Sequence, residues 1–75
     1  MLNSKSTVLT SLGTRIRSLR LTQGITQNQL AFNCEFEKSS MSKIESGQVN
    51  LSYFTLYRIS IGLNVLIRDL LPLDL

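Results

Sequence analysis

The spacing of the apolar residues constrains this chain most, because it has the period of an α-helix and nowhere the alternation of a half-buried strand. The clearest stripe, at steps of three and four, consists of Leu9, Leu12, Ile16 and Leu19. This stripe predicts an amphipathic helix from about Val8 to Gln23, and Gly24 is the residue expected to end it. No segment repeats, so we expect an all-α fold that is not a repeat array.

The start of a second helix is marked by a complete set of capping signals. Thr26 is followed three residues later by Gln29, the pattern of a capping box, and Ile25 and Leu30 have the spacing of a hydrophobic staple. A helix is therefore predicted to begin at Gln27. It is expected to be about two turns long, because the apolar pattern is interrupted by Asn33, Cys34 and Glu35.

Two more helices are predicted in the second half of the chain. One spans about Lys38 to Glu45 and is closed by Ser46 and Gly47. The next is capped by Ser52 and ends at Asn64, a residue suited to the left-handed conformation of a helix C-terminus. Its apolar positions, again at helical steps, are Leu56, Ile59 and Leu63.

A fifth short helix, Val65 to Leu71, is predicted to precede Pro72, which cannot continue it. A chain of 75 residues has room for one domain only. We expect a compact five-helix domain at residues 8–71, between a flexible N-terminal tail at 1–7 and a C-terminal tail at 72–75. Because so short a domain buries a modest surface, a partner subunit would help to stabilise it.

The composition argues against several classes of function. The chain has no histidine and one cysteine, Cys34, which rules out a zinc site, an internal disulfide and histidine-dependent catalysis. We therefore expect no enzyme, no metal or cofactor and no small-molecule substrate, and we interpret Cys34 as a packing residue. No apolar segment has membrane length and no secretion signal is evident, so a cytoplasmic location is expected. The net charge of +3 fits an anionic partner without requiring one.

Two short helices separated by a tight turn at residues 33–36 are typical of a DNA-binding helix-turn-helix. The segment reads TQNQLAFNCEFEKSSMSKIESGQVNLSYFTLYRISIGLNV. It closely resembles the Cro and C1-type, or xenobiotic response element, helix-turn-helix family of bacteria and phages, and the resemblance extends over about Leu12 to Leu71. The resemblance implies a lambda-repressor-like fold. It also implies a sequence-specific transcriptional regulator, with repression as the expected mode, that binds a pseudo-palindromic site on double-stranded DNA as a homodimer.

In the family, small and apolar residues hold the two helices of the motif together. The resemblance assigns this role to Leu30, Ala31, Phe36, Met41 and Ile44. Ala31 is small because the two helices cross closely there. Arg20 and Glu45 match positions that form a partly buried ion pair between the first helix and the recognition helix, so we expect that pair here as a structural feature.

The outward face of the third helix is the candidate reading surface. At about 100° per residue, Met41 and Ile44 point inward and leave a polar face on the opposite side. The candidates for base contacts are Lys38, Ser39, Ser42 and Lys43. Lys43 is expected to bind guanine O6 or N7, and Lys38 to contact a base or the backbone. The alternative is that this face is an ordinary solvated helix surface.

Contacts with the DNA backbone are expected on both sides of the reading helix. The candidates are Gln27, Ser46, Gln48 and Asn50. Gln27 stands at a helix N-terminus, where free amides and the positive end of the dipole favour phosphate. Gln48 and Asn50 match loop positions that hold the DNA backbone in the family, although polar loop residues of this kind also form turns.

Three residues near the turn depart from the family pattern. Glu35 stands where glycine is usual, and Glu37 replaces a small N-capping residue. Their carboxylates could favour the helix N-terminus, accept a hydrogen bond from cytosine or repel phosphate. Phe32 stands where a polar residue is usual, and it is either tucked against the turn or an exposed contact site.

The dimer interface and one rival function are left open by the sequence. The interface is sought in the loop before the fifth helix and among exposed residues, although these residues could instead complete the core. The candidates are Tyr53, Tyr57, Ile61 and Ile67. The rival function is a protein-interaction module of the same fold, such as an antitoxin-like partner, that presents its Glu35 and Glu37 edge to a protein.

Overall fold

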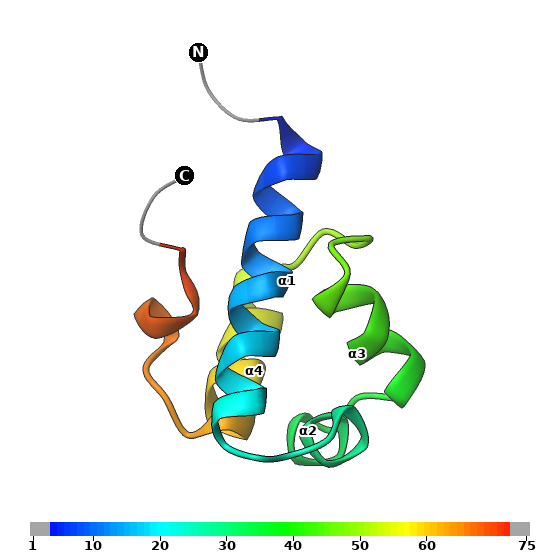
Figure 1. The fold of residues 1–75 in the computed structure, drawn as a ribbon, viewed down its shortest axis with the longest axis vertical. Helices are drawn as coiled ribbons and strands as arrows, with labels where there is room; N and C mark the ends of the chain where they lie inside the picture. The colour runs from blue at the N-terminus through cyan, green and yellow to red at the C-terminus, as the bar shows by residue number, and fades with distance from the viewer. Residues whose placement is uncertain (1–3, 73–75) are drawn as a thin grey trace.

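Four α-helices and one 3-10 helix make up the part of the chain that the computed structural model describes, residues 4–72. In chain order they are α1 (Lys5–Thr22), α2 (Gln27–Cys34), α3 (Lys38–Glu45), α4 (Tyr53–Leu63) and the 3-10 helix η1 (Ile67–Leu70). α1 runs along the long axis, with α4 behind it and with α3 and η1 on opposite sides of it (Figure 1). No strand occurs within residues 4–72, which confirms the all-α prediction.

α1 begins three residues earlier than the apolar stripe predicted. The Ser4 hydroxyl accepts a hydrogen bond from the Thr7 amide at 3.2 Å and caps the helix. Residues 5–7, assigned by the sequence to a tail, are therefore helical. The predicted start at Val8 was wrong because this first turn contains no apolar residue that would extend the stripe. Of the predicted tails, residues 1–3 and 73–75 lie outside the described residues.

The predicted start of α2 at Gln27 and the predicted bounds of α3 are confirmed. The turn predicted at residues 33–36 was placed two residues too early, because Asn33 and Cys34 belong to α2. At the start of α2 the capping box is formed: the Gln29 amide donates to Thr26 Oγ1 at 3.0 Å, and the Gln29 side chain accepts from the Thr26 amide at 2.7 Å. Ser52 caps α4 by accepting from the Thr55 amide at 3.0 Å.

The fifth predicted α-helix, Val65 to Leu71, is wrong: only the four-residue 3-10 helix η1 forms there. Asn64 adopts the predicted left-handed conformation, with φ of 57°, and the Val65 amide then donates back to Ser60 O. This cap of α4 occupies the residues that would begin a new helix. Leu71 is extended, as expected of a residue before proline, so the helix also ends early.

The core lies where α1, α2, α3 and α4 meet, and η1 closes one side of it. Its largest fully buried side chains are Ile16, Leu30, Met41, Ile59, Leu63 and Leu70. Ala31 and Ile44 are also buried, and Phe36 packs against this cluster from a half-buried position. The residues that the family resemblance assigned to the interior of the motif therefore lie there.

Two glycines allow helices to approach more closely than any side chain would permit. A Cβ at Gly13 of α1 would lie 2.5 Å from the carbonyl oxygens of both Ile44 and Glu45, at the end of α3. A Cβ at Gly62 of α4 would lie 2.4 Å from Cys34 Sγ at the end of α2. Gly13 therefore sets the distance between α1 and the C-terminal end of α3, and Gly62 sets the distance between α2 and α4.

Candidate nucleic-acid interface

α3 turns a polar face outward, as the helical period predicted. Met41 is fully buried and Ile44 is 5% exposed. The side chains predicted for base contacts, Lys38, Ser39, Ser42 and Lys43, are all exposed. Ser40, which the sequence analysis did not single out, is exposed as well. Figure 1 shows α3 at the side of the molecule, with no other element covering its outer face.

An ion pair joins α1 to α3 beneath this face. Arg20 Nε lies 2.7 Å from Glu45 Oε2 and Arg20 Nη2 lies 3.1 Å from Glu45 Oε1, with both residues buried. Gln27 Nε2, at the start of α2, donates to the same Glu45 Oε1 at 3.0 Å. The structure thus brings together three residues that the sequence analysis had assigned to two different roles.

Two hollows on the surface contain four of the residues predicted to contact DNA. The first is formed around the start of α2, where Gln27 and Lys38 share its wall with the backbone turn at Thr26. The second lies between α3 and the segment leading to α4, where Lys43 and Asn50 share the wall with Ser40. Polar donors from different elements therefore converge at each side of α3.

The other two predicted backbone contacts, Ser46 and Gln48, line neither hollow. Both are exposed. The Ser46 hydroxyl donates to Lys43 O at 3.1 Å, and the Gln48 amide donates to the same oxygen at 2.9 Å. Both residues therefore satisfy a carbonyl group at the C-terminal end of α3 while remaining exposed beside the helix.

The turn between α2 and α3 is held by Arg58 from α4, a residue that the sequence analysis did not identify. Arg58 Nη2 donates to Cys34 O at 2.8 Å and to Glu35 O at 3.0 Å, and its guanidinium carbon lies 4.5 Å from the centroid of the Phe36 ring. Glu35 is left-handed, with φ of 63°. Its carboxylate, 88% exposed, is 4.0 Å from the Arg58 guanidinium.

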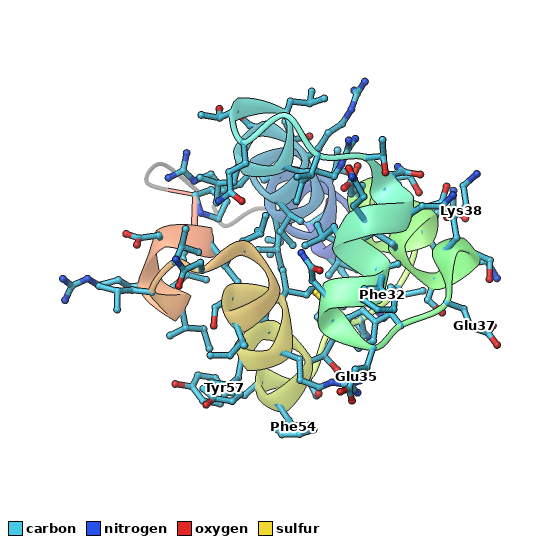
Figure 2. All side chains as sticks on the ribbon, turned by 90° about the horizontal axis from the view of Figure 1, so that it is seen from below. Phe32, Glu35, Glu37, Lys38, Phe54 and Tyr57 are labelled. Carbon is cyan, nitrogen blue, oxygen red and sulfur yellow. The ribbon has the colours of Figure 1, made fainter. Side chains whose placement is uncertain are left out.

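Phe32 and the two acidic residues of the turn lie at the surface. Phe32 is 83% exposed, so the interpretation that it is tucked against the turn is wrong. Glu37 is the N-cap of α3 but makes no side-chain capping hydrogen bond. Figure 2 shows Glu37 and Lys38 pointing outward at one edge, and Glu35 between Phe32 and the aromatic residues of α4.

α4 carries an exposed aromatic and apolar face, which we call the α4 face. It consists of Tyr53, Phe54, Tyr57 and Ile61, exposed by 73%, 65%, 50% and 59%. Of the residues proposed for the dimer interface, only Ile67 packs against the core. The interpretation as core residues is therefore wrong for the other three. Phe54, which the sequence analysis did not name, is exposed as well. The rings of Phe54 and Tyr57 stack at 6.5 Å between centroids.

A groove between α2 and the α4 face has the buried thiol of Cys34 at its base. Its walls are Asn33, Cys34, Glu35, Phe54, Tyr57, Arg58 and Ile61. Burial raises the pKa of the Cys34 thiol to about 11, although the positive charge of Arg58 opposes this effect. The thiol is therefore neutral near pH 7 and acts as an apolar packing group.

Within residues 4–72 no group of three or more His, Cys, Asp or Glu side chains is placed to hold a metal ion. The same residues contain no helix of the length and hydropathy needed to cross a membrane.

Comparison with known proteins relates this geometry to a family. The model of a family described as a helix-turn-helix domain matches residues 11–70. The control protein C.BamHI of Bacillus amyloliquefaciens is 37% identical over 60 residues, which cover 79% of this chain and 74% of that protein.

Two solved structures show how similar the folds are. The restriction-modification controller protein C.AhdI from Aeromonas hydrophila superimposes with a TM-score of 0.81 at 32% identity, covering 83% of this chain and 94% of that one. The clp gene regulator ClgR from C. glutamicum gives a TM-score of 0.80 at 25% identity, covering 84% and 82%. The same overall fold therefore occurs in known regulators.

Proposed function

Because this chain belongs to the helix-turn-helix domain family and is a DNA-binding regulator of transcription, we propose that it reads the major groove of a specific site with α3, as a homodimer, and acts as a repressor. C.AhdI is a restriction-modification controller and C.BamHI a control protein. Regulation of restriction-modification genes is therefore the first role to test.

The observation that carries this proposal is the exposed polar face of α3. A major groove admits one α-helix, and the side chains that enter it must donate or accept hydrogen bonds at base edges. Lys43 and Lys38 supply cations that can bind guanine, while Ser39 and Ser42 supply hydroxyl groups. No large apolar side chain interrupts this face, since Met41 and Ile44 are buried.

The two hollows beside α3 suit the phosphates that border a major groove. Gln27 uses one N–H of its amide nitrogen on Glu45, and the second N–H remains for a phosphate oxygen. Lys38 adds a positive charge to the same hollow, and Lys43 and Asn50 act together in the other. We propose that these contacts fix the position of α3 on the duplex and that the base contacts confer specificity.

A second copy of the chain is the proposed partner of the α4 face. Its four exposed side chains are apolar or aromatic over most of their surface, and none carries a charge. Pairing about a two-fold axis would bring the same face of each subunit together. The two copies of α3 would then lie about 34 Å apart and read the half-sites of a pseudo-palindrome.

Selection of bound duplexes from a random DNA pool tests the proposed function. We expect enrichment of a pseudo-palindromic sequence. The affinity for that sequence should fall steeply with salt, with a log-log slope of about −0.9 for each phosphate neutralised. A pool without enrichment, or equal affinity for the selected duplex and a scrambled one, would contradict the proposal.

The rival function, a protein-interaction module, is favoured by one observation: Phe32 is 83% exposed beside the acidic Glu35. The salt titration separates the two functions, because a protein partner need not show the slope of phosphate neutralisation.

A further inference from the structure

We propose that Arg58 is a positioning residue for DNA recognition: from α4 it fixes the turn that directs the N-terminal half of α3 into the groove. This inference rests on the proposed function, because it concerns how the reading helix is presented. Arg58 is not itself expected to touch DNA. Its role follows from the contacts that its guanidinium makes with the turn. It also follows from the absence of a glycine and of a capping side chain in that turn.

The Arg58 guanidinium binds the backbone at the C-terminal end of α2. The last carbonyl groups of a helix have no partner within it. Arg58 Nη2 supplies one, at 2.8 Å from Cys34 O and 3.0 Å from Glu35 O. One nitrogen of α4 therefore ties two successive carbonyl groups at the beginning of the turn.

The same guanidinium also holds the middle of the turn. It lies over the Phe36 ring at 4.5 Å, and a second aromatic ring, that of Phe54, is 5.9 Å away. The Phe36 amide donates to Ala31 O at 2.8 Å, so the backbone and the side chain of Phe36 are both fixed. A lysine could retain the charge but not the planar group that lies over the Phe36 ring.

Apart from the backbone hydrogen bonds that the Glu35 and Phe36 amides donate to α2, the turn has few local features that would fix it without Arg58. Its left-handed position is occupied by Glu35, where a residue with a Cβ is strained. The N-cap of α3, Glu37, makes no side-chain hydrogen bond to the helix. In many turns a glycine and a capping side chain would restrain the backbone locally. Here Arg58, from α4, supplies that restraint to the turn between α2 and α3.

The two ends of α3 are held by different helices. At the C-terminal end, the close approach at Gly13 and the ion pair of Glu45 with Arg20 fix α3 to α1. At the N-terminal end, the link to Arg58 runs through the turn. Loss of Arg58 should therefore loosen the end that carries Lys38 and Ser39, while the end near Glu45 stays in place.

Arg58→Lys is the variant that tests this, because it keeps the charge. We expect the affinity for a scrambled duplex to stay within about twofold and the salt slope to be unchanged, because the same number of phosphates is neutralised. Discrimination between the selected duplex and duplexes with single base-pair changes under the start of α3 should fall by roughly tenfold.

Two controls separate positioning from general effects. Arg17→Lys makes the same change at an exposed position of α1 and should leave discrimination unchanged. Ile59→Val removes one methyl group from the core of α4 and lowers stability without touching the turn. Equal loss of discrimination in Ile59→Val and Arg58→Lys would assign the effect to stability and overturn the proposal.

Amide hydrogen exchange gives a second measurement that needs no DNA. The Ser40 and Met41 amides donate to Glu37 O at the start of α3. In Arg58→Lys these amides should exchange at least about tenfold faster relative to those of α1, because local opening then costs less free energy. Unchanged exchange together with unchanged discrimination would overturn this inference alone, whereas a wild-type chain that discriminates no duplex would overturn the proposed function.

Discussion

The guanidinium of Arg20 in α1 donates two hydrogen bonds, of 2.7 and 3.1 Å, to the buried carboxylate of Glu45 in α3. Arg20 Nη1 also donates to Ile25 O at 2.9 Å, and Gln27 donates to Glu45. Within residues 4–72 no buried side-chain nitrogen or oxygen atom lacks a hydrogen-bond partner. The pair therefore joins α1, the start of α2 and α3 in one satisfied polar network.

Arg20→Met should strongly destabilise the fold, because it leaves the Glu45 carboxylate buried without its cation. We expect the free energy of unfolding, measured by urea titration, to fall by about 3–5 kcal/mol. The double variant Arg20→Met/Glu45→Met buries no unpaired charge and should recover most of this loss. A single-variant loss below about 1 kcal/mol, the range of an exposed pair, would show that water reaches the site.

Gly13→Ala should destabilise the fold although alanine is the better helix former. The new Cβ would lie 2.5 Å from two carbonyl oxygens of α3, and backbone cannot move aside as a flexible side chain can. Overpacking of this kind costs about 1–3 kcal/mol or more, which exceeds the gain of about 1 kcal/mol in helix propensity. Thr14→Ala, at an exposed position of the same helix, is the matched control. If both variants are equally stable in urea, the close approach is not a constraint.

The buried thiol of Cys34 should make stability depend on alkaline pH. Burial raises the pKa of this thiol in the folded state from 9.0 to about 11. Between these values the unfolded chain loses the proton while the folded chain keeps it, so unfolding is favoured as the pH rises. The neutral thiol therefore makes its full contribution to the free energy of unfolding below pH 9. This contribution, about 3 kcal/mol in total, is lost by about pH 11.

The measurement is the free energy of unfolding of wild type and of Cys34→Ala across this range. All other side chains are the same in the two proteins, so the difference in the free energy of unfolding isolates the thiol. The advantage of the wild type over Cys34→Ala should shrink from pH 9 to pH 11. A constant difference would mean that the folded thiol titrates like an exposed one.

The sequence predicts well those features of the fold that are set by interactions between residues close to one another in the chain. Thr26 and Ser52 cap their helices through residues three positions away, and Asn64 acts on the helix that it ends. The two faces of α3 follow from helical period alone. Gly13 showed no comparable signal, because its role depends on the α3 backbone, which is distant in sequence.

The errors around the candidate site also arise where contacts join segments that are distant in sequence. Arg58 is a surface position in the pattern of α4, and only the folded chain shows that it reaches the end of α2. Phe32 is apolar yet exposed, because the inner face of α2 is already occupied by Leu30, Ala31 and Cys34. Hydrophobicity cannot tell whether such a residue faces a core, a partner or solvent.

Lys43→Ala and Gln27→Ala should weaken DNA binding in different ways. Loss of Lys43 removes a base contact, so preference should relax at one base position of each half-site at a cost of about 1–3 kcal/mol. Loss of Gln27 removes a proposed phosphate contact together with its hydrogen bond to Glu45, and it should weaken binding to selected and scrambled duplexes alike. Binding titrations with substituted duplexes measure both, with Thr14→Ala as a control. An equal loss on every duplex for both variants would contradict this division of roles.

Ile61→Lys tests whether the α4 face joins two copies of the chain. Ile61 is 59% exposed, so the change should alter the stability of the monomer by no more than about 0.5 kcal/mol. Within a two-fold interface the same change buries two unpaired ammonium groups, and the dimer dissociation constant in analytical ultracentrifugation should rise by at least about 30-fold. Phe32→Lys, at an equally apolar and more exposed position outside the α4 face, should leave that constant unchanged. If Phe32→Lys raised the dimer dissociation constant more than Ile61→Lys did, the interface would lie on the outer side of α2 and not on the α4 face.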